Sequence, residues 1–122
     1  MKKLGILGGM GPEATILLME KILHLVEAED DRNHIPMIVH QNTQVPSRIK
    51  AILEGSGASP EPTLKKMALE LQSLGCDFLA MPCNTAHYYF GSLSNCVDIP
   101  FLNMLEISTK VLYDLGMSRI GI

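Results

Sequence analysis

A cysteine with two polar neighbours is the feature of this sequence that is best suited to chemistry. Cys83 follows an apolar run at 78–81, and Asn84 and Thr85 come directly after it. We predict a buried strand at 78–81 and a helix just after Thr85, so that Cys83 lies at the carboxyl edge of a sheet, where open α/β proteins bind ligands. The N-terminus of a helix favours the thiolate, the nucleophilic and basic form of cysteine. The alternative is a small apolar core residue, as many free cysteines are; the polar neighbours favour the functional interpretation.

A glycine-rich turn is the second candidate site. Gly8, Gly9 and Gly11 follow the apolar run at 4–7, and Pro12 is suited to the first turn of a helix. The N–H groups of such a turn can bind a carboxylate or a phosphate at the helix N-terminus. The spacing matches neither the dinucleotide fingerprint GxGxxG nor a P-loop, which requires Lys followed by Ser or Thr. Alternatively, the glycines serve only the geometry of a tight turn.

A polar segment after a later predicted strand is the third candidate site. Asn42, Gln44 and Arg48 follow the apolar run at 35–40, at the same predicted edge of the sheet as Cys83. Arg48 could bind a substrate carboxylate through two parallel N–H groups. Alternatively, Arg48 is a solvated residue at the start of a helix, while Asn42 and Gln44 satisfy the hydrogen bonds of a turn.

The other histidines, cysteines and methionines are expected to do no chemistry. His87 would lie one turn into the helix after Cys83, where it could be a base, an orienting residue or a surface residue; we favour the orienting role. No Cys and His spacing matches a zinc site, so no metal is expected. His24, His34 and His40 are expected to be structural or solvent-exposed. Cys76, which follows a helix cap, and Cys96, which is expected in a loop, are expected to be structural. Met67, Met104 and Met117 are expected to fill the core.

Strands and helices alternate along the chain. Apolar runs predict strands at residues 4–7, 35–40, 78–81 and 99–102, with another beginning at 118–122. Apolar residues at helical spacing predict helices at residues 14–29, 49–53, 63–74, 86–93 and 104–115. This alternation predicts a parallel sheet with right-handed connections. We therefore expect an α/β fold, an open parallel sheet flanked by helices in a flavodoxin-like layered domain.

Particular residues are expected to shape these elements. Pro100 restricts the strand at 99–102 to its first residues or to a sheet edge. Gly75 is suited to end the helix before it. The apolar face of the first long helix is expected to be Leu17, Leu18, Ile22, Leu25 and Val26. That of the helix at 63–74 is expected to be Leu64, Met67, Ala68, Leu71 and Leu74.

Composition excludes several classes of protein. The 122 residues are enough for one domain with a core, and the apolar content of 47% argues against disorder. With a net charge of −3 and no basic cluster larger than Lys65–Lys66, no nucleic-acid partner is expected. No apolar run is long enough for a membrane span, and Gly8 and Gly9 interrupt the run that a signal peptide would need. Three widely spaced cysteines suggest free thiols in a reducing cytosol, so a cytoplasmic location is expected.

Three sequence blocks resemble those of a known family. They are Gly-Gly-Met-Gly-Pro-Glu-Ala-Thr at 8–15, Gln-Asn-Thr-Gln-Val-Pro-Ser-Arg at 41–48 and Met-Pro-Cys-Asn-Thr-Ala-His at 81–87. With these three blocks, the chain resembles the N-terminal half of proteins of the aspartate/glutamate racemase family, most closely those of the aspartate racemase branch. The resemblance implies two pseudo-symmetric α/β domains, a homodimer, and an active site between the domains. It also implies that no cofactor is used and that one cysteine from each domain serves as acid or base.

The resemblance also assigns roles to single residues. Cys83 matches the first catalytic cysteine, whereas the second would lie beyond Ile122, so we expect the 122-residue chain to be inactive alone. Ser47 departs from the Asp that the family usually has before the arginine, which bears on the choice of substrate side chain. The residues expected to bind the substrate are Met10 and Gly11 in a closing loop, Asn42, Gln44 and Arg48 in the recognition segment, and Asn84 and Thr85 at the carboxylate.

The expected function is racemisation of aspartate or glutamate, with a small dicarboxylic amino acid as the partner molecule. Residues 1–98 would form the N-terminal racemase domain, and residues 99–122 the crossover and the start of a second domain, which is cut off. Two alternatives remain. One is a related decarboxylase or isomerase that uses a single cysteine. The other is a non-catalytic module for amino-acid binding or dimerisation.

Overall fold

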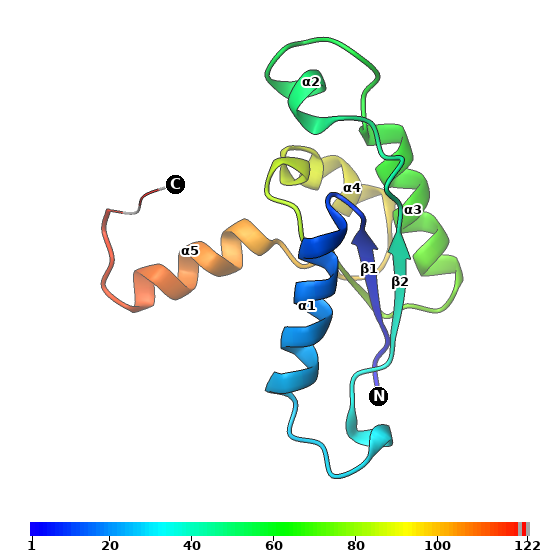
Figure 1. Cartoon of the computed structure of the whole chain (residues 1–122), viewed down its shortest axis with the longest axis vertical. Coiled ribbons are helices and arrows are strands. Elements are labelled where there is room, and N and C mark those ends of the chain that lie inside the picture. The colour runs from blue at the N-terminus through cyan, green and yellow to red at the C-terminus, as the bar shows by residue number, and fades with distance from the viewer. Residues whose placement is uncertain (120, 122) are drawn as a thin grey trace.

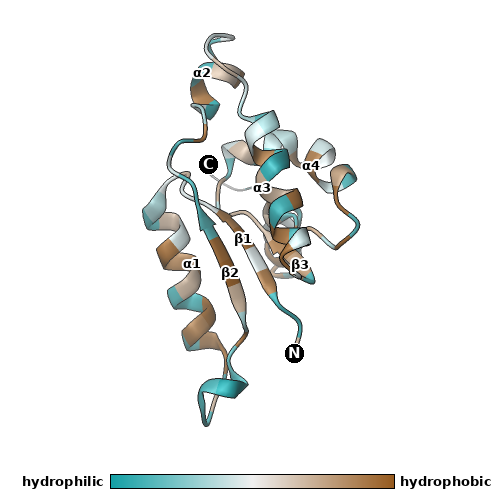
Figure 2. Ribbon diagram, turned by 90° about the vertical axis from the view of Figure 1, so that its right-hand side faces the viewer, coloured by the Kyte–Doolittle hydropathy of each residue, from teal (hydrophilic) through white to brown (hydrophobic). Residues whose placement is uncertain are grey.

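The protein has a three-stranded parallel sheet with helices on both faces. The computed structural model describes residues 1–119 and 121. Its strands β1 (Leu4–Gly8), β2 (Met37–Gln41) and β3 (Phe78–Ala80) lie in the order β2-β1-β3. Leu4 is paired with Met37 on one side and with Phe78 on the other. Helix α1 covers one face, and α3 and α4 cover the other (Figures 1 and 2). The predicted α/β fold with an open parallel sheet is confirmed.

The helices mostly begin and end where local sequence signals place them. They are α1 (Pro12–Leu25), α2 (Arg48–Ile52), α3 (Glu61–Ser73), α4 (Phe90–Cys96) and α5 (Met104–Asp114), with 3-10 turns η1 (Asp31–Asn33) and η2 (Thr85–Tyr89). Pro12 opens α1 as predicted. Gly75, at φ +89°, follows α3 in the left-handed conformation that favours glycine. Helix α1 ends four residues before the predicted position, because the chain turns into extended backbone at Val26.

Two predicted elements differ from those observed. The single helix expected at 86–93 is a 3-10 turn, η2, followed by α4, which extends to Cys96. Cys96 is therefore the last residue of a helix and does not lie in a loop. The strand expected at 99–102 is one bridge between Phe101 and Leu79, flanked by hydrogen bonds from Leu79 N–H to the Pro100 carbonyl and from Leu102 N–H to the Leu79 carbonyl. Pro100 has no N–H with which to extend this pairing.

The core lies between the sheet and α3. Leu64, Met67, Ala68 and Leu71 of α3 are buried, as predicted. Leu74 is exposed, so its assignment to this face is wrong. Helix α3 ends at Ser73, and the chain returns beneath its last turn through Cys76, which is buried there instead and donates its N–H to the Leu71 carbonyl.

The opposite side of the sheet is less covered. Thr15 is the one buried residue of α1, whereas Leu17 and Leu25 of its predicted apolar face are exposed, Leu25 at 83%. No residue of α5 is buried, and Figure 1 shows this helix projecting away from the sheet. Met117 is exposed rather than in the core. Among the described residues, these apolar side chains are therefore left largely uncovered.

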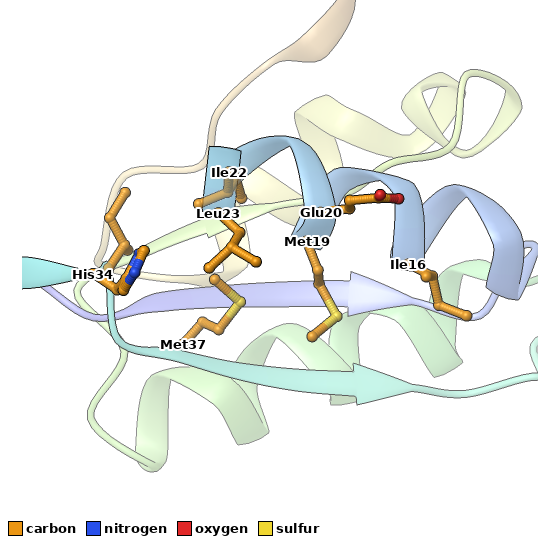
Figure 3. Close-up of a pocket in the computed structure, with 8 residues that line it drawn as sticks. Ile16, Met19, Glu20, Ile22, Leu23, His34 and Met37 are labelled. Atoms are coloured by element: carbon orange, nitrogen blue, oxygen red, sulfur yellow. The ribbon is translucent and has the colours of Figure 1, made fainter. Parts of the chain in front are cut away.

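An apolar cavity of about 420 Å³ lies between α1 and β2. Figure 3 shows Met19 and Leu23 of α1 pointing toward the strands, with Met37 of β2 close to Leu23. The described residues of its walls include Glu20 and His34 but no thiol or hydroxyl, so they differ from the surroundings of Cys83. Of the helices that the structure describes, none combines the length and the apolar character needed to cross a bilayer.

Candidate active site

A second cavity brings Cys83 and the glycine-rich turn together. It has a volume of about 480 Å³ and lies where β1 and β3 end, in the space beside the first turns of α1. Its walls include four of the predicted site residues, Met10, Cys83, Asn84 and Thr85. The remaining lining residues are Ala14, Leu17, Leu18, Lys21, Pro82 and Met104. The first and third sequence blocks therefore meet at one edge of the sheet.

Cys83 presents a largely covered thiol to this cavity. The residue is 8% exposed, and its Sγ lies 3.5 Å from the Thr85 hydroxyl oxygen. Its backbone N–H donates to the Met81 carbonyl at 2.9 Å. The helix predicted to follow Cys83 is only the five-residue η2 turn, in which fewer peptide dipoles add up than in an α-helix. The nearest polar partner of the thiol is thus a hydroxyl group.

Thr15 holds the glycine-rich turn in place. Its hydroxyl oxygen, fully buried, accepts the N–H of Gly9 at 2.9 Å and donates to the Gly11 carbonyl at 3.5 Å. Gly9 has φ +97°, and a Cβ there would lie 2.4 Å from the Asn42 backbone. Only glycine meets both conditions at this position. The turn therefore places Met10 in the cavity wall, while Gly11 caps α1 just behind it.

The segment at 42–48 lies beside this cavity but does not line it. Asn42 packs against Gly9, and its side-chain oxygen accepts the Gln44 N–H at 2.9 Å. Arg48 donates from one guanidinium nitrogen to the carbonyls of Val45 and Pro46 at 3.3 and 3.2 Å. The Arg48 Nε is buried without a hydrogen-bond partner. Helix α2, which Arg48 begins, contacts η2. The three predicted segments thus converge, but the guanidinium is bound to its own loop.

Comparison with known proteins settles the family. Residues 7–122 match the model of the Asp/Glu/hydantoin racemase family. The chain belongs to this family. It is 29% identical over 111 residues to the broad specificity amino-acid racemase RacX of Bacillus subtilis (strain 168), a match that covers 88% of this chain and 48% of RacX.

Solved structures agree with the family assignment. The Picrophilus torridus aspartate racemase superposes with a TM-score of 0.87 at 35% identity, over 95% of this chain and 49% of that one. An aspartate racemase homologue from Pyrococcus horikoshii OT3 has the same fold, with a TM-score of 0.78 at 24% identity over 95% of this chain and 50% of that one. The chain spans about half the length of these relatives.

The other two cysteines do not line the cavity that holds Cys83. Burial raises the pKa of the Cys76 thiol, and burial likewise raises the pKa of Cys96. All three cysteines are free. Neither Cys76 nor Cys96 lines the cavity of Cys83. The prediction that both are structural agrees with these surroundings. Among the described residues, no group of His, Cys, Asp and Glu is placed to hold a metal ion.

Two residues at the site have roles that the sequence did not indicate. Thr15 belongs to the first family block, and its residue type alone gives no sign that its side chain holds the glycine-rich turn. Its position four residues after Gly11, in the first turn of a helix, is the signal that could have suggested a bond back to the turn. Lys21 is the one charged residue among the described residues that line the cavity. It follows Leu17 by four positions and therefore shares its helix face.

Proposed function

We propose that this protein is a racemase of dicarboxylic amino acids, aspartate first and glutamate second, that uses no cofactor. Cys83 is one of its two acid/base cysteines. The observation that carries the proposal is the position of Cys83, whose thiol shares a cavity with the glycine-rich turn in a member of the Asp/Glu/hydantoin racemase family. The superposition with an aspartate racemase at 35% identity supports the choice of substrate.

In the proposed mechanism one sulfur takes a proton from the α-carbon and a second sulfur, on the opposite face, gives a proton to it. The Cys83 thiolate removes the α-proton and becomes a thiol, and the electron pair of the C–H bond passes into the substrate carboxylate as an enediolate. A second thiol on the opposite face then donates its proton to the α-carbon and becomes a thiolate, which inverts the centre. Without a cofactor, hydrogen-bond donors must stabilise the enediolate. The Thr85 hydroxyl, the Asn84 amide and the amides of Met10 and Gly11 are the proposed donors.

Two cationic residues are proposed to select an acidic substrate. Lys21 lines the cavity and can pair with a carboxylate that enters it. Arg48, with Asn42 and Gln44 before it in the chain, is proposed to bind the side-chain carboxylate once its guanidinium leaves the carbonyls of its own loop. The buried, unpartnered Nε of Arg48 is a donor that such a carboxylate would satisfy.

The second cysteine is proposed to come from outside these 122 residues. Residues 1–98 then form the first domain, and 99–122 lead into the second. A cytoplasmic homodimer is proposed with it. The free thiols fit a reducing compartment. The exposed apolar residues of α1 and α5 fit an interface.

Exchange of the α-proton in heavy water tests the function. In the full-length protein, we expect Cys83→Ala to abolish exchange for at least one enantiomer of aspartate, followed by proton NMR. Cys96→Ala is the matched control, since Cys96 lies away from the cavity, and it should retain exchange of both enantiomers. Full exchange of both enantiomers by Cys83→Ala would refute the assignment.

A non-catalytic binding module is the second candidate. The observation that favours it is that Cys83 is the one cysteine lining the cavity among the described residues. Isothermal titration with aspartate separates the two, because binding without exchange in the full-length protein indicates a module. Product analysis with aspartate, glutamate and an arylmalonate would reveal a single-cysteine decarboxylase instead.

A further inference from the structure

His87 is a buried histidine whose two ring nitrogens both have backbone partners. The residue is 6% exposed. Its Nδ1 lies 2.6 Å from the carbonyl oxygen of Cys83, and its Nε2 lies 3.2 Å from the backbone nitrogen of Met104. An amide N–H can only donate, so Nε2 is the acceptor and carries no proton. Nδ1 therefore holds the proton and donates it to Cys83. These partners fix one neutral tautomer and leave His87 no free lone pair to act as a base.

The two partners of the ring stand on different walls of the cavity. Cys83 ends the segment after β3, whereas Met104 is the first residue of α5, and both line the same cavity. The Met104 N–H is one of the donors that the first turn of a helix leaves unsatisfied, and the histidine ring caps it. The Phe90 ring is stacked parallel to His87 at a centroid distance of 5.9 Å, which restricts the imidazole further.

We propose that His87 is a positioning residue for Cys83, and that its Nδ1–H donor fixes the backbone that carries the thiol. The inference rests on the proposed role of Cys83 as an acid/base. The other backbone bonds near Cys83 are local ones, from Cys83 N–H to Met81 and from His87 N–H to Asn84. Within the described part of the chain, the His87 ring links this turn to the distant Met104. Without it the turn is free to move, which exposes the thiol and misaligns it with a substrate α-carbon.

Two amide variants separate the two bonds of the ring. In His87→Asn the side-chain nitrogen takes the place of Nδ1 and keeps the donor to Cys83, whereas the bond to Met104 is lost. In His87→Gln the side-chain oxygen takes the place of Nε2 and keeps the acceptor for Met104, whereas the bond to Cys83 is lost. Both variants replace a buried ring by an amide, so a purely structural role predicts similar effects of the two.

Alkylation of each cysteine by iodoacetamide, followed by peptide mass spectrometry, gives the readout in the 122-residue chain. We expect His87→Gln to raise the alkylation rate of Cys83 about fivefold, because the loss of one hydrogen bond raises the population of the state with an exposed thiol by about that factor. His87→Asn should stay within about twofold of the parent rate, since it keeps that bond. Cys76 and Cys96 serve as internal controls and should keep their rates in both variants.

Several results would overturn the proposal. They are an unchanged Cys83 rate in His87→Gln, equal increases in the two variants, and parallel increases at all three cysteines, which would indicate general loosening of the fold. If neither variant folds, long-range proton–nitrogen NMR of the parent chain still decides, because an Nε2–H tautomer or an imidazolium at pH 7 contradicts the assigned bonds. These readouts do not depend on racemisation. In the full-length protein, His87→Gln should also lower the maximal rate of aspartate exchange more than His87→Asn does.

Discussion

Replacing Thr15 by valine isolates the hydrogen bonds that hold the glycine-rich turn. Valine has nearly the same shape as threonine, so Thr15→Val leaves the packing of this fully buried residue intact and removes only its hydroxyl. The Gly9 N–H, 2.9 Å from that hydroxyl, is then buried without an acceptor. Such a group costs about 1–3 kcal/mol, and the longer bond to Gly11 adds little. We expect the free energy of unfolding to fall by about 2 kcal/mol.

The assay is urea denaturation followed by circular dichroism, with an unchanged m-value as evidence that the unfolded state is unaffected. For a domain of this size, the same loss lowers the melting temperature by roughly 8 °C. Thr15→Ser is the matched control, because it keeps the hydroxyl and loses one methyl group, which costs about 1 kcal/mol. A valine variant as stable as the parent, or less destabilised than the serine variant, would show that Thr15 acts through packing and not through its bond to Gly9.

Two further predictions concern stability. Gly9→Ala should destabilise the protein by more than about 3 kcal/mol or prevent folding, because its Cβ would lie 2.4 Å from the Asn42 backbone at a φ of +97°; a melting temperature near that of the parent would contradict this. Because burial raises the pKa of Cys76 and Cys96 in the folded protein, their contribution to stability is complete below the unfolded thiol pKa, about 8.5, and is lost as the pH rises through the higher folded pKa. The urea concentration at the unfolding midpoint should therefore decrease as the pH is raised from 7.5 to 9.5, and the decrease should be smaller in Cys96→Ala. A midpoint that increases over this interval would contradict the expected sign.

The sequence predicted those features that depend on neighbouring residues. Pro12 and Gly75 mark a helix start and a helix end because each restricts or permits particular backbone angles at its own position. The alternation of apolar strands and helices predicted a parallel sheet, and the end of β3 predicted the position of Cys83 at its carboxyl edge. Polarity along the chain was therefore enough to place the thiol at the carboxyl edge of the sheet.

Burial of whole helix faces was less predictable. Leu25 has the same spacing and chemistry as a core residue, yet it is exposed, whereas the small residue Cys76 fills space beneath α3. Apolar periodicity shows which face of a helix prefers burial, but coverage depends on which other segments reach that face. The helix predicted after Cys83 is a 3-10 turn for a related reason. There the chain must bring His87 back toward the Cys83 carbonyl, 2.6 Å from its ring, and onward to α5.

The sequence by itself determined the order of the elements, the glycine-rich turn and the chemistry available at the sheet edge, because these follow from each residue and its near neighbours. Only the tertiary structure decided which side chains share the cavity. Met104 lies 17 positions from His87, yet its N–H fixes the protonation of that ring. Arg48 bonds to its own loop, although its type suits a substrate carboxylate. Such partners depend on distances in space, which residue spacing along the chain does not specify.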